Sequence, residues 1–347
     1  MLVAADTPAR YDPPIVAKAS IMPTLTVTFE PGESGRALIA DLLTGTATPV
    51  WLTDLDDQAR SAALGAATAI LARDTGKELR AHEPALIGNA RLVQYMTAGV
   101  DHIRLSQLPP SVPVANNGGA YADAMAEHAV AMMLAAAKRL LIEHNAMIAG
   151  AFNQFTRNRS LRGKTCGILG FGGIGIATAR LTRGLGMHVH AINRRGRTEQ
   201  PVEWIGTPDD LATMLRAADV LVIAAPLTRK TIGMIGRDEL ALMKRDAILV
   251  NLARGELVDE AALFAHLQTV PDFFACIDAW WVEPVRHGTF RMDHPFLTLP
   301  NVIGSPHNSA SVPGNREAAL RHALANIKRA LAGEPPRNLV GADERML

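Results

Sequence analysis

A glycine-rich segment, Thr165–Arg180, constrains the fold of this chain more than any other feature. It reads T-C-G-I-L-G-F-G-G-I-G-I-A-T-A-R, so Gly170, Gly172 and Gly175 form G-x-G-x-x-G between an apolar run and a helical pattern. Such glycines allow a tight turn, close approach of the backbone to a pyrophosphate, and close packing of helix on strand. Free N–H groups at the start of the helix then bind the phosphates. Similar turns also occur for packing alone, but this context predicts dinucleotide binding, and no Gly-Lys-Ser/Thr follows that would indicate a nucleoside triphosphatase.

Short apolar runs alternate with longer helical patterns along most of the 347 residues. The clearest predicted strands are Leu92–Met96, Thr165–Leu169, His188–Ile192, Val220–Ala224 and Ile248–Leu252. Continuous apolar strands separated by helices are typical of parallel sheets that are covered on both faces. The sequence therefore predicts an α/β protein, and its length suits two domains.

Two further helices are predicted with different surroundings. Tyr121–Leu140 is apolar nearly all round, which indicates burial either inside the chain or against a second subunit. Arg316–Leu331 ends at Gly333 and the pair Pro335-Pro336, and it follows the last strand of the central unit. The chain could therefore return here to pack on the first domain.

The residues after the second strand of the glycine-rich unit bear on the choice of cofactor. An NAD enzyme usually carries Asp or Glu there to bind the ribose hydroxyls. This chain has Asn193, Arg194 and Arg195, which offer two guanidinium groups for a 2′-phosphate and no carboxylate to repel it. We predict a preference for NADP (NADPH) over NAD. The alternative is that the arginines are solvated turn residues and that NAD is accepted.

Three polar residues follow later apolar strands, and they form the candidate catalytic set: Arg254, Glu283 and His307. The carboxyl ends of parallel strands face the crevice where α/β proteins bind ligands. An arginine can bind a carboxylate in bidentate fashion and polarise the neighbouring carbonyl. A protonated histidine can deliver a proton, and a paired carboxylate keeps a histidine charged near neutral pH. Together these residue types suit carbonyl reduction, although each alone could be an ordinary surface group.

Composition limits the other classes of function. With 35 basic and 34 acidic residues the net charge is +1, so no field of one sign favours nucleic acid or an anionic membrane. Cys166 and Cys276 lie in apolar runs and are expected to be free core residues, as in a reducing compartment. The N-terminus does not read as a signal peptide, and the longest apolar run, Ala129–Ala137, is too short for a membrane span. We expect a soluble cytoplasmic protein without a metal site.

These motifs resemble the D-isomer-specific 2-hydroxyacid dehydrogenase family, in particular its glyoxylate/hydroxypyruvate reductases. The resemblance extends from about Leu92 to Ala310. It rests on the blocks Y-M-T-A-G-V-D-H-I, L-G-F-G-G-I-G, A-P-L-T-R-K-T-I-G-M-I, V-N-L-A-R-G-E-L-V-D-E, D-A-W-W-V-E-P and S-P-H-N-S-A. The blocks occur in the family's order.

The resemblance implies a flavodoxin-like substrate domain, residues 1–120 plus 311–347, into which a Rossmann cofactor domain, residues 121–310, is inserted. It implies that Arg254 binds the substrate, that His307 is the acid/base supported by Glu283, and that backbone N–H groups near Ala98 and Gly99 bind the substrate carboxylate. It also implies a homodimer and Asp278 facing the nicotinamide carboxamide. The further cofactor-binding positions that it implies are Gly173, Ile174, Pro226, Thr231, Leu252, Ala253, Ser309 and Ala310.

Other readings of the sequence stay open. A non-catalytic NAD(P)-sensing protein of the same fold is one alternative, although the chain keeps its Arg, Glu and His and lacks long disordered tails. A formate or phosphite dehydrogenase is a weaker alternative. The pair Trp280-Trp281 is similar to the formate dehydrogenase branch, but that branch has Gln where this chain has Glu283. The candidates for the walls of the substrate pocket are Tyr121, Trp280, Trp281, Phe290 and Met292, with plain core packing as the alternative.

Overall fold

The computed structural model describes residues 22–345. The N-terminal segment, which we predict is not a signal peptide, lies outside these residues. The chain divides into two compact units. Unit 1 consists of the residues up to Ala120 together with those from Pro313 onward, and unit 2 is Tyr121–Val312. The chain therefore leaves unit 1, forms unit 2, and returns to unit 1 for its last helix.

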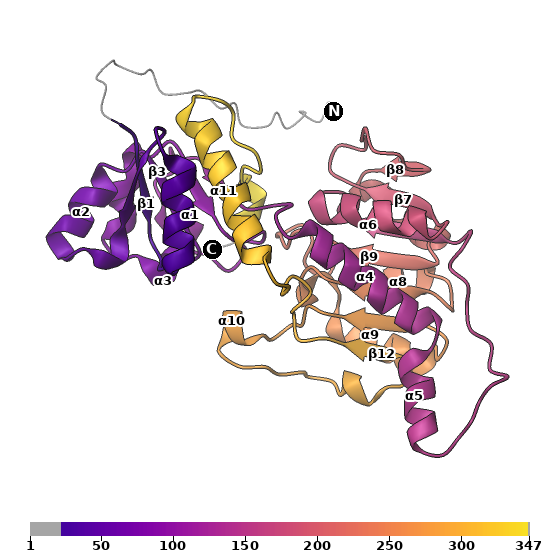
Figure 1. The fold of residues 1–347 in the computed structure, drawn as a ribbon. Helices are drawn as coiled ribbons and strands as arrows, with labels where there is room; N and C mark the ends of the chain where they lie inside the picture. The colour runs from indigo at the N-terminus through magenta and orange to yellow at the C-terminus, as the bar shows by residue number, and fades with distance from the viewer. Residues whose placement is uncertain (1–21, 346–347) are drawn as a thin grey trace. The chain divides into compact units, whose positions relative to one another are not determined.

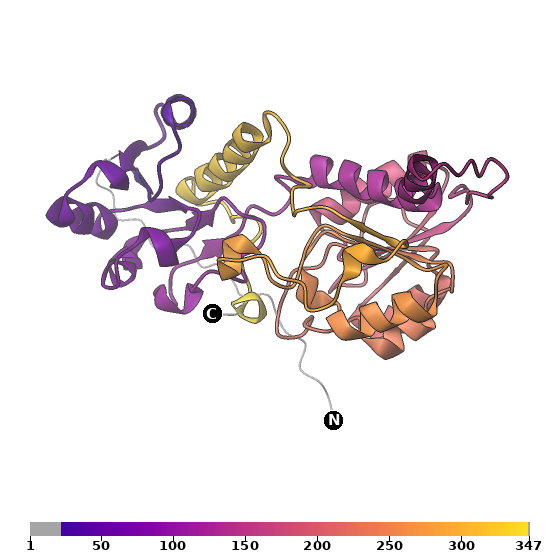
Figure 2. The same ribbon diagram turned by 90° about the horizontal axis from the view of Figure 1, so that it is seen from below.

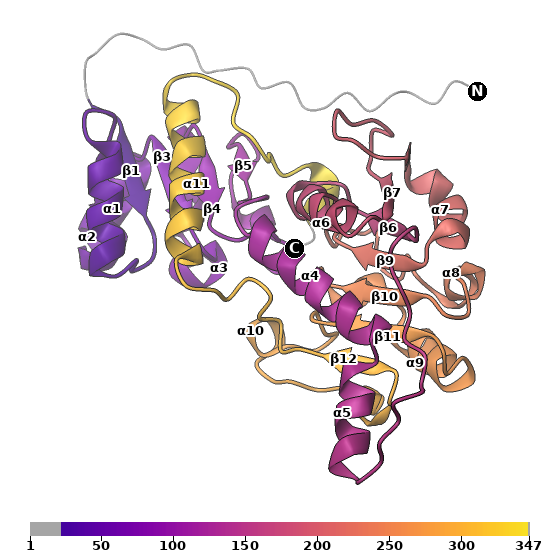
Figure 3. The same ribbon diagram turned by 45° about the vertical axis from the view of Figure 1, so that its right-hand side comes forward.

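Unit 1 is built on a five-stranded parallel sheet with the order β2-β1-β3-β4-β5. Its strands are β1 (Thr24–Val27), β2 (Thr48–Trp51), β3 (Ala69–Ala72), β4 (Val93–Tyr95) and β5 (Val114–Ala115). Its helices are α1 (Glu33–Leu43), α2 (Asp57–Gly65), α3 (Thr75–Glu78) and α11 (Asn315–Leu331). Helix α11 packs beside α1 on the face of β3 and β4 (Figures 1 and 3). This is the flavodoxin-like strand order.

Unit 2 contains a seven-stranded parallel sheet with the order β12-β11-β10-β9-β6-β7-β8. Its strands are β6 (Thr165–Leu169), β7 (His188–Ile192), β8 (Trp204–Gly206), β9 (Val220–Ile223), β10 (Ile248–Asn251), β11 (Phe274–Ile277) and β12 (Val302–Gly304). Its helices are α4 (Ala122–Ala137), α5 (Leu140–Ile148), α6 (Gly173–Gly184), α7 (Leu211–Ala217), α8 (Arg237–Leu242), α9 (Glu260–Thr269) and α10 (Pro284–His287). Seen from below, α4 and α9 cover opposite faces of the sheet (Figure 2). The order reverses between β6 and β9, as in a Rossmann fold.

The predicted α/β class, with a Rossmann sheet and a flavodoxin-like sheet, is confirmed. Strands β9, β10 and β11 are buried at every position, because helices cover both faces of the sheet. Cys166 and Cys276 are free and fully buried in β6 and β11, as predicted. No helix among residues 22–345 is long and apolar enough to cross a membrane.

The helix predicted at Tyr121–Leu140 is wrong at its C-terminal end. Helix α4 stops at Ala137, and Arg139 adopts a left-handed conformation with φ 52° before α5 begins at Leu140. The apolar face of α4 is buried inside unit 2, where Met125, Met132 and Met133 pack against the sheet and α6. Burial within the chain therefore accounts for α4, and the exposed apolar side chains lie on α5 instead.

Candidate active site

The three motif glycines occupy three different environments at the carboxyl end of β6. Gly170 has φ +100°, and a methyl group there would lie 2.5 Å from the carbonyl carbon of Ala224. A methyl group on Gly175 would overlap the carbonyl oxygen of Gly170 and lie 3.0 Å from Ile168 Cγ2. Gly172 is exposed, precedes α6, and has no other atom within 4 Å of where its Cβ would be. Gly170 and Gly175 therefore allow close packing, whereas Gly172 leaves open space beside the backbone.

This open space fits a dinucleotide. Helix α6 begins at Gly173, directly after the exposed Gly172, so its first N–H groups face the carboxyl edge of the sheet. Gly173 is exposed and Ile174 is half-buried. The turn also lies where the strand order reverses, which is where open α/β sheets bind nucleotides. These features supply the cradle for a pyrophosphate that the sequence predicts.

The turn after β7 is organised by the side chain of Asn193. Its Oδ1 accepts a hydrogen bond from the N–H of Arg195 at 2.9 Å, and its Nδ2 donates to the carbonyl of Arg197 at 3.0 Å. Arg194, Arg195 and Arg197 are all exposed around this turn. Sequence reasoning missed Arg197, although the run R-R-G-R signals it. Three exposed arginines therefore lie beside the residue that takes the place of the usual carboxylate.

Two turns at the ends of β9 and β10 hold the other predicted cofactor positions. Thr231 donates from its hydroxyl to the carbonyl of Pro226 at 2.8 Å, which closes the turn after β9. After β10, Leu252 is buried and Ala253 is half-buried. The N–H of Ala253 donates to Asn251 Oδ1 at 3.1 Å. Both turns lie at the same edge of the sheet as Gly172, because all seven strands are parallel.

Arg254 lies three residues beyond the end of β10, and Asn251 shapes its turn. The Nδ2 of Asn251 donates to the carbonyl of Arg254 at 2.8 Å. The guanidinium of Arg254 donates from Nη1 to the carbonyl of Ala253 at 2.7 Å. Arg254 is half-buried. Its charge is close enough to Glu283 to help lower the pKa of that carboxyl.

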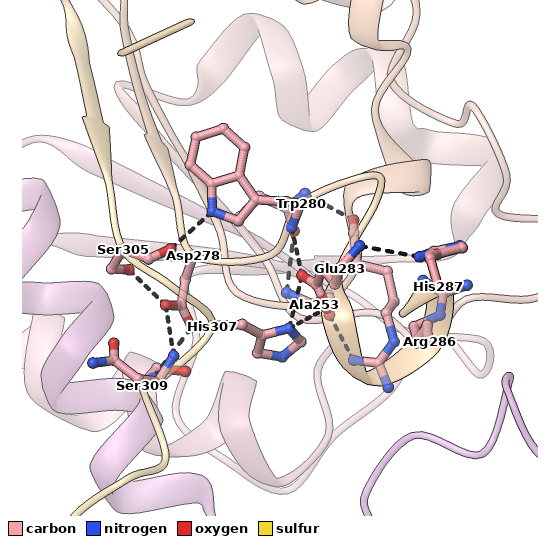
Figure 4. A network of polar contacts seen from close by, with 12 residues as sticks. Ala253, Asp278, Trp280, Glu283, Arg286, His287, Ser305, His307 and Ser309 are labelled. Atoms are coloured by element: carbon pink, nitrogen blue, oxygen red, sulfur yellow. Dashed lines mark hydrogen bonds and ion pairs between the residues drawn. The ribbon is translucent and has the colours of Figure 1, made fainter. Parts of the chain in front are cut away.

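Glu283 and His307 form a direct pair (Figure 4). Nδ1 of His307 lies 2.8 Å from both carboxylate oxygens of Glu283. Glu283 is only 6% exposed, and its Oε1 also accepts the backbone N–H of Trp280 at 2.7 Å. Burial alone would raise the pKa of Glu283, but the hydrogen bond and charge of His307, followed by the Trp280 N–H and Arg254, lower it below its usual value. Glu283 is therefore an anion near neutral pH, and Nε2 of His307 is the ring nitrogen left for other partners.

The backbone of His307 adopts a left-handed conformation with φ 50°, which is unusual for a residue other than glycine. The fully buried Asp278 holds the residues on either side. Its Oδ1 accepts the hydroxyl of Ser305 at 2.5 Å and the N–H of Asn308 at 3.1 Å, and its Oδ2 accepts the N–H of Ser309 at 3.3 Å. The carboxylate therefore stabilises the loop that presents the imidazole (Figure 4).

The same loop contains a buried hydroxyl group without a partner. Ser309 is 3% exposed, and its hydroxyl oxygen has no hydrogen-bonding partner among the described residues. A buried hydroxyl normally has a partner, so a polar group of a bound cofactor fits this position. Ala310 follows it and is half-buried.

Sequence reasoning missed Ser305 and His128. Nε2 of His128, on α4, lies 3.0 Å from Ser305 Oγ, which extends the polar network around Asp278. Ser305 directly follows β12, and that position at a strand end could have signalled it, whereas His128 lies within an apolar helix and leaves no signal. Trp280, a candidate pocket wall, is instead 3% exposed and belongs to the core.

The predicted substrate-binding positions are divided between the units. Ala98 and Gly99 follow β4 in unit 1 and are half-buried, while Arg254, Glu283 and His307 lie in unit 2. Among residues 22–345, no cluster of three or more His, Cys, Asp or Glu side chains could hold a metal ion.

Comparison with known proteins gives consistent matches. The family model described as D-isomer specific 2-hydroxyacid dehydrogenase, NAD binding domain, matches residues 130–309. A glyoxylate reductase of Thermococcus litoralis is 32% identical over 277 residues, which cover 77% of this chain and 80% of that protein. A D-3-phosphoglycerate dehydrogenase of Methanocaldococcus jannaschii is 34% identical over 70% of this chain, but the match spans only 46% of that longer protein.

A solved structure is similar across nearly the whole chain. It is a D-isomer specific 2-hydroxyacid dehydrogenase from Xanthobacter autotrophicus Py2 in complex with NADPH and MES. It is 26% identical, with a TM-score of 0.74, and the match covers 92% of this chain and 98% of that one.

Proposed function

Because the chain belongs to the D-isomer specific 2-hydroxyacid dehydrogenase family, we propose that it reduces a small 2-oxo acid to a D-2-hydroxy acid with NAD(P)H. Glyoxylate and hydroxypyruvate are the substrates that we favour. The observation that carries the proposal is the buried Glu283 carboxylate paired with His307 at 2.8 Å, beside Arg254 and on the same sheet edge as the glycine-rich turn.

Different residues bind the substrate and transfer the proton. When bound, NAD(P)H supplies the hydride. Reduction places negative charge on the carbonyl oxygen, and His307 delivers a proton to that oxygen from Nε2, because Nδ1 is held by Glu283. Arg254 binds the substrate carboxylate and polarises the carbonyl. The family resemblance also assigns carboxylate binding to backbone N–H groups near Ala98 and Gly99.

We propose that the chain prefers NADPH to NADH, on the basis of the turn after β7. Asn193 is neutral and already bonded within its own turn, so no carboxylate repels a 2′-phosphate. The exposed Arg194 and Arg195 supply the fork geometry that binds phosphate. The NADPH complex of the similar Xanthobacter structure agrees with this preference. NAD is the alternative cofactor.

The exposed apolar side chains of α5 support a homodimer as the assembly. Leu140, Leu141, Met147 and Ile148 are between 45% and 74% exposed on a helix that projects from the rest of unit 2 (Figure 3). A patch of this kind marks an interaction site, and a second copy of the chain is the partner that we propose. Sedimentation equilibrium should then give twice the chain mass of 37.1 kDa.

The test of the proposed function is NAD(P)H oxidation with a panel of 2-oxo acids. We expect His307→Gln to lower kcat by about 100-fold or more, since general acid–base catalysis contributes roughly that much. The Kd for NADPH should change little. The matched control is His82→Gln, on an exposed residue of unit 1, which should behave as wild type. Wild-type turnover in His307→Gln would refute the mechanism. A wild-type protein that binds NADPH but reduces no 2-oxo acid would instead support the cofactor-sensing alternative.

A further inference from the structure

Trp280 makes two hydrogen bonds that join the loops of Glu283 and His307. Its backbone N–H donates to Glu283 Oε1 at 2.7 Å, and its indole Nε1–H donates to the carbonyl of Ser305 at 2.8 Å. Ser305 lies two residues before His307 and precedes Pro306, which has no N–H of its own. One residue therefore contacts the carboxylate and the backbone that carries its imidazole partner (Figure 4).

The packing of Trp280 extends this link to Arg254. A methyl group on Gly304 would lie 2.8 Å from Trp280 Cζ2, so the indole lies directly against the end of β12. A methyl group on Gly255 would lie 2.5 Å from the carbonyl carbon of Trp280, so the residue after Arg254 packs on the Trp280 backbone. Trp280 therefore touches Glu283 itself and close neighbours of the other two candidate catalytic residues.

The indole is held firmly from its other side. Its ring makes edge contacts with Phe290 and Phe296, with centroids 5.7 and 6.5 Å away, and the side chain is 3% exposed. A buried side chain with a fixed rotamer can fix the position of the backbone that it binds.

We propose that Trp280 is a positioning residue that sets the geometry between Glu283 and His307 by tying the Ser305 carbonyl to the Glu283 loop. This inference rests on the proposed function only for its kinetic consequences. Phenylalanine could fill most of the same space, but it has no N–H for Ser305. Without that bond the loop would shift, and His307 would leave the carboxylate. Glu283 would then keep the backbone N–H at position 280 and the nearby charge of Arg254, but it would lose the imidazole that lowers its pKa most.

The experiment compares Trp280→Phe with Trp281→Phe. Trp281 is a matched control, because its indole donates an equivalent 2.8 Å bond to the carbonyl of Val258 and stacks on Phe296, away from the His307 loop. A size-compensated variant, Trp280→Phe with Gly304→Ala, returns part of the lost volume but not the N–H. The measurements are kcat, the KM for NADPH, the pH profile of kcat, and hydrogen–deuterium exchange of the peptide Val302–Ser311 in the full chain.

We expect Trp280→Phe to lower kcat about tenfold, with the KM for NADPH within about threefold. The acid limb of the pH profile should move upward by about half a unit or more, because the buried carboxylate loses its partner. The Val302–Ser311 peptide should exchange faster, and the size-compensated variant should show the same changes. Trp281→Phe should keep the wild-type pH profile and the wild-type exchange of Val302–Ser311.

The inference is overturned if Trp280→Phe keeps the wild-type pH profile and exchange, if the size-compensated variant recovers both, or if Trp281→Phe changes them equally. A wild-type protein that reduces no 2-oxo acid would refute the proposed function alone. In that case, hydrogen–deuterium exchange of Val302–Ser311 in Trp280→Phe and Trp281→Phe would still test the positioning role of Trp280, because this measurement does not depend on turnover.

Discussion

The three glycines of the cofactor turn should fail in different ways when each is replaced by alanine. Gly170 has φ +100°, and its added methyl group would lie 2.5 and 2.6 Å from backbone atoms of Ala224 and Ala225. The positive φ alone costs about 1–3 kcal/mol, and backbone atoms cannot rotate away from the clash. We therefore expect Gly170→Ala to lose about 3 kcal/mol or more. In a unit of this size that corresponds to roughly 10 °C in Tm.

Gly172→Ala should fold normally and lose the cofactor. Its φ of −100° and ψ of −156° suit any residue, and no atom lies within 4 Å of the added methyl group. The free energy of unfolding should therefore change by less than about 1 kcal/mol. The methyl group would, however, stand where a pyrophosphate approaches the backbone. We expect the affinity for NADPH to fall by about 10–100-fold, which is about 1.4–2.8 kcal/mol.

Two measurements separate these outcomes: thermal unfolding followed by circular dichroism, and a fluorescence titration with NADPH. The control is Gly184→Ala at the end of the same helix, where the methyl group also meets nothing within 4 Å. It should retain both stability and binding. Wild-type affinity in Gly172→Ala would show that this backbone does not meet the pyrophosphate. A loss of stability as large as that of Gly170→Ala would contradict the structural argument itself.

Two further predictions concern charge. The pKa of Glu283 is lowered in the folded protein, so its ionised form stabilises the fold above the ordinary value of 4.5, and that contribution is lost as the pH falls through the lower folded value. In urea unfolding, the free energy of unfolding of wild type should exceed that of Glu283→Gln by a constant amount above about pH 5.5. This difference should shrink below pH 4.5. A difference that grows on acidification would contradict the pairing of Glu283 with His307. Asn193→Asp keeps the acceptor for the Arg195 N–H and adds a charge, so the ratio of kcat/KM for NADPH to that for NADH should fall about tenfold or more. An unchanged ratio would remove Asn193 from cofactor selection.

Much of the fold could be predicted from the sequence because its strands are buried on both faces. A parallel strand of this kind is a continuous apolar run, and the predicted β6 and β7 match the observed bounds of Thr165–Leu169 and His188–Ile192. Arg254, Asp278 and His307 could be placed at one edge of the sheet for a related reason, since parallel strands all end there. The break at Arg139 could not be predicted, because a single left-handed residue leaves no mark on apolar periodicity.

The support around His307 could not be predicted, because it depends on where loops direct their side chains. The sequence shows that Asp278 is a carboxylate at the end of a predicted strand. The family resemblance implies that this carboxylate faces the nicotinamide carboxamide. In the structure its two oxygens accept bonds from Ser305, Asn308 and Ser309, and these bonds surround a histidine held at φ 50°. A strained backbone at such a position persists only where its surroundings fix it. Asp278 therefore orders the loop that carries His307 whether or not it also meets the cofactor, so the loss of activity in an Asp278 variant would not by itself prove contact with nicotinamide.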